Sequence, residues 1–565
     1  MGGSAGNSAG ATGSSGAAGT STAGLGGGAG TIGGGGGATP PDPNAAGLMP
    51  LRHLSQAEYL NTVADLLGDT SLTADALPED IAADPDTMPY PQPDIVGTLA
   101  ATQYHDAAQK LAANVLTKLT TFLPCNATGD ATCAQQWLTS FLPKAYRRPV
   151  TAAETGELLD LYKTSRVAPL SLSINDAFSL VLRAILQSPG FLYHWEMDPT
   201  APAQAGPIIQ LDSYAIANRL SYFVTGSMPD AQLFAAAASG GLSTPDAVAA
   251  QVQRLLASPR AHPTVESFFD NWLGLDLAQS QPKDPTVYPA YQSDNVKAAV
   301  EAEAHGFVDN IVLAGSGAFA DLFTSTQSLT NQYLAPLYAA GGGGGTTPSG
   351  ATMRPVTLNP AQRSGILTSI AFLAATGGAD KTVPPRRGKA MYTHVLCQTL
   401  GMLPNVIPMP VQTMGTTRQI FEAHDQLGCA AGCHTLIEPF GYTFEHYDGI
   451  GQFRTVEHID PQNPATTAPI DSHSTVTVDG KPQDVADAVA LSHVIAQSTQ
   501  AEQCFATHWM RYALGRLETP EDQASLQSAM SAFSAHNFNV RDLIVGLVTS
   551  RTFRFRTLAP GEVMQ

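Results

Sequence analysis

The sequence is poor in basic residues and has no long apolar run. Lys and Arg number 29 against 48 Asp and Glu, the formal net charge is -19, and no run of Lys or Arg exceeds two residues. Such a chain lacks the basic surface that follows phosphates, so we expect no nucleic-acid partner and no affinity for anionic membrane surfaces. No apolar stretch approaches the roughly 20 residues of a membrane-spanning helix.

The common catalytic signatures are also missing. The chain contains no Gly-x-Ser-x-Gly elbow, no Walker loop and no His-Glu-x-x-His pair, and it has no internal repeat. These motifs mark serine hydrolases, nucleotide-binding loops and zinc peptidases. The sequence therefore points to none of these enzyme classes and leaves open whether the protein is an enzyme.

Cysteine is scarce, but its arrangement is informative. Two of the six cysteines lie in Cys429-Ala-Ala-Gly-Cys433-His434. Two thiols on one helical face followed by an imidazole are typical of covalent haem attachment, in which the thiols add to the haem vinyl groups and the histidine ligates the iron. The usual spacing is two residues and here it is three, but an i,i+4 pair still shares a face. The motif predicts one covalent haem c.

Three other interpretations of the motif remain open. Cys429 and Cys433 can form a short-loop disulfide with His434 as an ordinary loop residue. They can supply half of a zinc site, although no second close cysteine pair completes it. A free catalytic thiol beside His434 is the third, although adjacent residues rarely reach each other as a nucleophile and base must.

The other four cysteines divide into two pairs. Cys125 and Cys133 flank a polar loop rich in Gly, Asn and Asp, which predicts a disulfide and an oxidising compartment, with two free surface thiols as the alternative. Cys397 and Cys504 remain. They either bridge two segments of the C-terminal half or stay separate as buried thiols.

A haem electron carrier needs a sixth iron ligand, and methionine is the common choice. We expect Met510 in this role, with Met409 and Met414 as alternatives. Arg454 follows the motif after a glycine-rich turn, and its planar guanidinium suits a haem propionate. An exposed Arg454, or one paired with Asp448, is the alternative.

The hydrophobic pattern is mainly helical. Ser55 and Glu58 form a capping box ahead of a helix that Gly68 ends, and Ser474–Asp479 is the clearest strand-like alternation. We expect a mainly α, multi-domain protein. Its segments are a disordered Gly/Ala/Ser/Thr-rich tether at 1–46, helical domains at 47–124, 125–205 and 206–350, a haem-motif domain at 351–480 and a helical domain at 481–565.

Several sequence blocks occur together in a known group of proteins. They are Leu51-Arg-His-Leu-Ser-Gln-Ala-Glu-Tyr59, Ala145-Tyr-Arg-Arg-Pro-Val-Thr151, Gln187-Ser-Pro-Gly-Phe-Leu-Tyr193, Asn218-Arg-Leu-Ser-Tyr-Phe223, Ser227-Met-Pro-Asp230, Pro385-Arg-Arg-Gly-Lys389, Leu396-Cys-Gln398, Glu438-Pro-Phe-Gly441 and Arg511-Tyr-Ala-Leu-Gly-Arg516. With these blocks the chain resembles uncharacterised secreted proteins of planctomycetes and myxobacteria. That group concatenates domains of unknown function and carries a cytochrome-c-like Cys-x-x-Cys-His segment. The resemblance implies a haem-binding C-terminal half, although the motif here has one extra residue.

These observations together predict an exported c-type haem protein. We expect electron transfer or a haem-dependent redox step at the cell envelope, with a partner protein that the sequence does not identify. The expected location is periplasmic, anchored to the outer membrane or secreted, with membrane contact only through a lipid anchor upstream of the tether. The alternative is a non-enzymatic extracellular binding protein, for polysaccharide for example, in which Cys429 and Cys433 form a structural disulfide.

Overall fold

The computed structural model describes residues 40–92, 97–123, 130–196, 207–339, 348–401, 414–425, 430–460, 463 and 465–558. Residues 1–39 of the expected tether lie outside the described residues. Three residues of the predicted sites, Cys125, Met409 and Cys429, also lie outside them.

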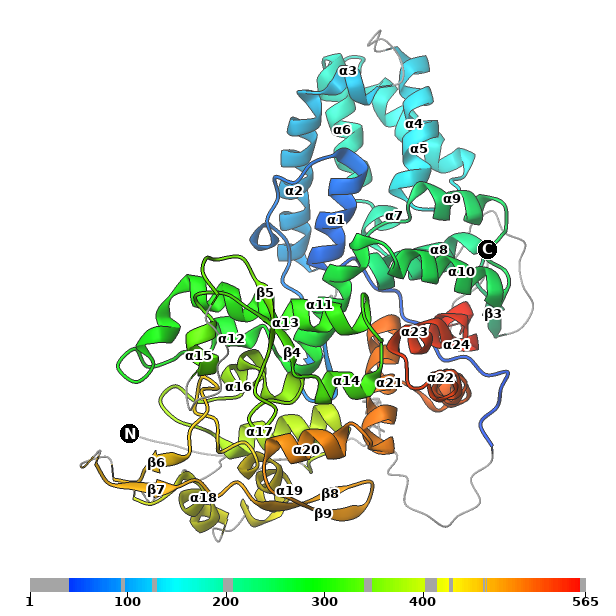
Figure 1. Cartoon of the computed structure of the whole chain (residues 1–565). Helices are drawn as coiled ribbons and strands as arrows, with labels where there is room; N and C mark the ends of the chain where they lie inside the picture. The colour runs from blue at the N-terminus through cyan, green and yellow to red at the C-terminus, as the bar shows by residue number, and fades with distance from the viewer. Residues whose placement is uncertain are drawn as a thin grey trace, which may run out of the picture. The chain divides into compact units, whose positions relative to one another are not determined.

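The first helices of the described chain surround a hydrophobic core of their own, in which Trp137 and Phe178 lie edge to face. Figure 1 shows this group in blue to cyan. Its helices are α1 (Gln56–Leu67), α2 (Thr98–Leu116), α3 (Leu119–Phe122), α4 (Ala131–Ala145), α5 (Ala152–Ser165), α6 (Ile174–Leu186) and α7 (Pro189–Leu192).

Local sequence signals set the ends of these helices. The Ser55 side chain accepts a hydrogen bond from the Glu58 backbone N–H, and the Glu58 side chain accepts one in return from Ser55 N–H. Gly68 ends α1 in the left-handed conformation, with φ of 62°. The capping box and the glycine stop predicted for this helix are confirmed, because both satisfy backbone groups that a helix end leaves unpaired.

A second, larger core takes up most of the remaining chain. Its central aromatic contact is Phe268 stacked on Trp509, with ring centroids 3.8 Å apart. The helices after α7 are α8 (Ser213–Thr225), α9 (Ala231–Ala238), α10 (Pro245–Leu256), α11 (His262–Leu273), α12 (Leu277–Ser280), α13 (Asp294–Val312), α14 (Phe319–Thr324), α15 (Ala335–Ala339), α16 (Ile370–Ala375), α17 (Pro384–Ala390), α18 (Thr417–Asp425), α19 (Ala430–Tyr442), α20 (Ala488–Ile495), α21 (Thr499–Leu514), α22 (Gln523–Ala535), α23 (Val540–Thr549) and α24 (Arg551–Arg554). A π-helix, η6 (Met391–Val395), continues α17. Within the described part of the chain, no helix is both long and apolar enough to span a bilayer.

Strands contribute little to the fold, which confirms the prediction of a mainly helical protein. In the described residues they form two-stranded antiparallel sheets. The pairs are β1 (Ile81–Asp84) with β2 (Met88–Gln92), β3 (Ile208–Gln210) with β10 (Phe555–Thr557), β4 (Gln327–Thr330) with β5 (Arg354–Thr357), β6 (Val456–His458) with β7 (Thr467–Pro469), and β8 (Ser474–Val478) with β9 (Lys481–Val485). The predicted strand at Ser474 is therefore β8.

The beginning of the described chain packs against its end. Thr557 N–H donates to Gly47 O at 3.1 Å, and Arg551 Nε donates to Asn44 O at 2.5 Å. Ala46 is completely buried. The folded unit therefore begins several residues before the expected end of the tether at residue 46.

Two glycines let α17 and α19 cross in close contact. A Cβ atom added to Gly388 would lie 1.8 Å from the carbonyl oxygen of Ile437, and one added to Gly441 would lie 2.0 Å from that of Pro384. Only glycine permits backbones to approach this closely. The crossing fixes α19, the helix that carries the predicted haem motif (Figure 1).

Three buried cations hold the chain that follows α19. Arg387 donates to Tyr447 O at 2.9 Å, Arg363 to Gly451 O at 2.8 Å, and Lys283 to Gly449 O at 2.9 Å. Burial lowers the pKa of Lys283 to about 8, since a desolvated ammonium is disfavoured. These cations satisfy carbonyl groups of a tight turn, so their role in this part of the chain is structural.

Candidate functional site

Cys433 and His434, the described part of the predicted haem motif, lie on α19. Cys433 is a free thiol of intermediate exposure, and His434 follows it on the same helix. Helix α18 packs beside α19. Cys429 lies outside the described residues, and haem attachment through either thiol remains a prediction.

A buried carboxylate orients the imidazole of His434. Nδ1 of His434 lies 2.5 Å from Oε1 of Glu438, one helical turn later, and Glu438 is completely buried. The hydroxyl of Tyr442 donates to the other carboxylate oxygen. In a neutral imidazole whose Nδ1–H donates to a carboxylate, Nε2 carries the lone pair that can ligate a metal. Arg418 in turn lies 4.9 Å over the ring of Tyr442.

This arrangement is the one that a metal-ligating histidine typically has. Such a histidine donates its other ring N–H to a carboxylate or carbonyl, which fixes the tautomer and raises the basicity of the ligand. Glu438 was not among the residues predicted from the sequence. Its position four residues after His434, on the same face of a helix, was the available signal.

Apolar side chains are exposed around the motif. Leu436, three residues after Cys433, is 45% exposed, and Met414, just before α18, is 58% exposed. A residue three positions along a helix shares the face of the first. The helix face that carries the motif thus includes an uncovered apolar side chain, which a flat apolar cofactor is suited to cover.

The structure gives no support to Met510 as an iron ligand. Its side chain is 2% exposed and belongs to the large core on α21. Among the described residues, α21 shares no extensive contact with α19, which packs against α17, α18, η6 and β8 instead. The identity of the sixth iron ligand therefore remains a prediction. Of the two alternative methionines, Met414 is described, and it lies just before α18.

Arg454 is held by protein carboxylates. Its Nη2 lies 3.0 Å from Oε2 of Glu445 and 3.9 Å from Oε2 of Glu457. Burial raises the pKa of Glu445, although the charges of Arg454 and Arg387 oppose that shift. A contact between Arg454 and a haem propionate remains a prediction.

One predicted disulfide is confirmed. Cys397 and Cys504 are bonded, with 2.08 Å between their sulfur atoms, across 107 residues of sequence. Cys133 is also disulfide-bonded. Cys125, its expected partner, lies outside the described residues, so that pairing remains a prediction.

Comparison with known families finds tandem matches along the described chain. Five family models match, each described as a protein of unknown function: DUF1587 at residues 52–117, DUF1595 at 133–196, DUF1592 at 211–339, DUF1588 at 363–457 and DUF1585 at 481–553. The chain is therefore one of the multi-domain proteins that concatenate these families. The DUF1588 model, named PSCyt3, spans Cys433 and His434. No curated protein and no solved structure matches the chain significantly.

Proposed function

We propose that this protein is an exported c-type haem protein that transfers electrons at the cell envelope. His434 would ligate the haem iron, and Cys429 and Cys433 would hold the haem covalently. The observation that carries the proposal is the hydrogen bond from Nδ1 of His434 to buried Glu438. When bound, the haem supplies a one-electron redox couple.

The residues around His434 would tune the reduction potential of the haem. Glu438 is fixed on both sides, since His434 and Tyr442 each donate to one of its oxygens. A histidine whose Nδ1–H is bonded to a carboxylate is a more basic ligand than one bonded to water. A more basic ligand favours the oxidised metal, so this pair keeps the reduction potential low.

Three further observations support the proposal. The name of the PSCyt3 model, which covers the motif, points to a cytochrome-like domain. The Cys397–Cys504 disulfide suits an oxidising compartment, and so favours a periplasmic, outer-membrane-anchored or secreted protein. Cys433 is a free thiol, which does not favour the alternative of a structural Cys429–Cys433 disulfide.

The experiment is expression in a host that has haem-attachment machinery, followed by haem staining of a denaturing gel. Wild type should stain, and the double variant Cys429→Ala/Cys433→Ala should not. Cys125→Ala/Cys133→Ala is the matched control, since it removes another close cysteine pair that no histidine follows. Equal staining of all three proteins contradicts the proposal.

A second variant tests the role of Glu438 in the loaded protein. Glu438→Gln keeps the shape of the side chain but removes its negative charge, so the reduction potential should rise while the covalent haem remains. The readout is a potentiometric titration followed in the visible spectrum. An unchanged potential in a normally loaded variant means that Glu438 does not tune the iron ligand.

A further inference from the structure

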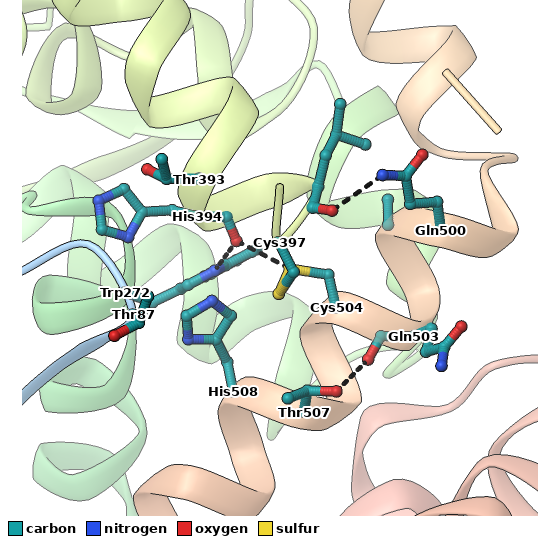
Figure 2. The surroundings of a disulfide bond; sticks show 12 residues. Thr87, Trp272, Thr393, His394, Cys397, Gln500, Gln503, Cys504, Thr507 and His508 are labelled. Carbon is teal, nitrogen blue, oxygen red and sulfur yellow. Dashed lines mark hydrogen bonds between the residues drawn. A yellow bond between two sulfur atoms is a disulfide. The ribbon is translucent and has the colours of Figure 1, made fainter. Parts of the chain in front are cut away.

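The Cys397–Cys504 disulfide lies beside a buried imidazole. Cys504 and His508 are one turn apart on α21, and a ring nitrogen of His508 lies within 4.8 Å of both sulfur atoms. Figure 2 shows the imidazole of His508 next to the disulfide, with His394 above it. Two thiol sulfurs and an imidazole nitrogen that converge in this way are the donor set of a thiophilic metal ion.

His508 has a ring nitrogen with no hydrogen-bond partner among the described residues. The side chain is completely buried, and its Nδ1 lies 3.0 Å from the hydroxyl of Tyr90. Its Nε2 makes no hydrogen bond within the described part of the chain. Burial lowers the pKa of His508 well below its usual value, so the ring is neutral. Buried polar atoms are almost always paired, so an imidazole that has an unpartnered nitrogen and lies within 4.8 Å of both sulfurs is a candidate metal ligand.

The other side of the disulfide is built from an irregular segment. Cys397 follows the π-helix η6 and has φ of 50°, a left-handed conformation that is unusual for cysteine. The carbonyl of His394, inside η6, accepts a hydrogen bond from Trp272 Nε1 at 2.8 Å. π-Helical turns are frequent at functional sites. The ring of His394 is also mostly buried, and its Nδ1 has no hydrogen-bond partner in the residues that the structure describes.

We propose that Cys397, Cys504 and His508 form a zinc site when the disulfide is reduced. The site is masked in the oxidised protein and becomes available on exposure to a dithiol. Cys397 is only half-buried, so reductant and metal can approach from its side. The zinc site requires no bound haem.

The site forms in two steps, reduction of the disulfide and then binding of the metal. A dithiol reductant transfers two electrons and two protons to the disulfide, which becomes two thiols, while the reductant becomes a disulfide. Binding of Zn²⁺ then displaces the two thiol protons to solvent, because the thiolate is the metal ligand. His508 contributes a nitrogen lone pair, and no proton leaves the imidazole.

Charge favours Zn²⁺ over a monovalent ion. Two thiolates and a neutral imidazole around Zn²⁺ carry no net charge, and a buried site tolerates only neutral or compensated groups. Three protein ligands leave one position of the zinc tetrahedron for water or for His394, whose ring centroid is 6.4 Å from that of His508. Cu⁺ with the same ligands would leave a negative charge in the core.

The test uses Co²⁺ as a spectroscopic probe of the zinc position. The full-length protein carries Cys429→Ser and Cys433→Ser, so that the haem-motif thiols cannot bind the metal. After anaerobic reduction by a dithiol and removal of the reductant, Co²⁺ should give thiolate charge-transfer bands and the strong visible bands of a tetrahedral ion. Zn²⁺ should displace it, and without reduction no bands should appear.

Substitutions then separate this site from the remaining thiols. In the same background, His508→Gln should weaken Co²⁺ binding more than about tenfold. The matched control, exposed His473→Gln, should bind normally, and so should Cys125→Ser/Cys133→Ser. Equal affinity in the His508 and His473 variants, or loss of the bands in the Cys125/Cys133 variant, overturns the proposal.

Two measurements use a protein that keeps His508, so they test the site even if the His508 variant does not fold. X-ray absorption of the zinc-loaded Cys429→Ser/Cys433→Ser protein should show two sulfur ligands and at least one nitrogen ligand, and circular dichroism should show that the reduced protein stays helical. A shell without nitrogen overturns the site. Unfolding on reduction also overturns it, because the disulfide would then be only a structural clamp.

Discussion

A methyl group added at Gly388 should separate α17 from α19. The added Cβ would lie 1.8 Å from the carbonyl oxygen of Ile437, whereas favourable contacts are about 3.5–4.0 Å. The obstacle is a backbone atom, so no side-chain rotation can relieve the overlap. The two helices must therefore move apart, and α19 with His434 and Glu438 must move with them.

The magnitude follows from two opposed effects. Overpacking typically costs about 1–3 kcal/mol, and a backbone obstacle places Gly388→Ala near the upper end. Alanine is the better helix former by about 1 kcal/mol. We therefore expect a net loss of about 2 kcal/mol. Since 1.4 kcal/mol is a factor of ten, α19 should open roughly 30 times more often.

Hydrogen exchange followed by mass spectrometry is the assay, because it reports local opening. Peptides that cover α19 should exchange faster in Gly388→Ala, with smaller changes in α1 and α2. The matched control is Gly432→Ala in α19, where an added Cβ meets nothing within 4 Å. The control should protect α19 by up to about 1 kcal/mol. Equal protection in both variants would refute the close crossing.

Three further predictions concern stability. Burial lowers the pKa of His305, but the hydrogen bond and charge of Asp270 raise it more, so the net shift is upward. The pair's contribution is therefore full below the unfolded pKa of about 6.5 and is lost as pH rises through the folded value. The melting temperature should therefore fall as pH rises above about 6.5, and His305→Gln should flatten that fall. An unchanged pH profile in the variant would count against the His305–Asp270 pair. Burial raises the pKa of Asp522, but Arg516, in a two-bond pair at 2.6 and 3.0 Å, lowers it more. Asp522→Asn should cost about 3–5 kcal/mol at pH 7 and less as pH falls through the folded pKa; a cost that stays the same as pH falls through that pKa would contradict the pairing. A chain that begins at Pro40 should have the same melting temperature as the full-length protein, because the contacts between the two ends of the described chain remain. A clearly lower melting temperature in calorimetry would show that the earlier residues stabilise the fold.

The sequence predicted features that are local. Ser55, Glu58 and Gly68 define both ends of α1 because a capping box and a left-handed glycine act within one or two turns. The alternation at Ser474 likewise predicted β8, since its inward residues are buried in the structure. These signals depend on neighbouring residues alone.

Features that depend on distant contacts were not predictable. Gly388 and Gly441 are ordinary helical positions until α17 and α19 cross there. The buried state of Met510 follows from the packing of α21 and not from its own spacing. His508 meets the disulfide only because η6 returns Cys397 to α21. Glu438 is an intermediate case, because its spacing from His434 was visible but its burial was not.

The central claim is that α19 carries a covalently bound haem. Its most direct test is the visible spectrum of the full-length protein, produced with haem-attachment machinery and measured after acid–acetone extraction. We expect the haem absorption to stay with the protein, because thioether bonds to Cys429 and Cys433 survive a treatment that removes haem held by His434 alone. A colourless protein after extraction would contradict the account.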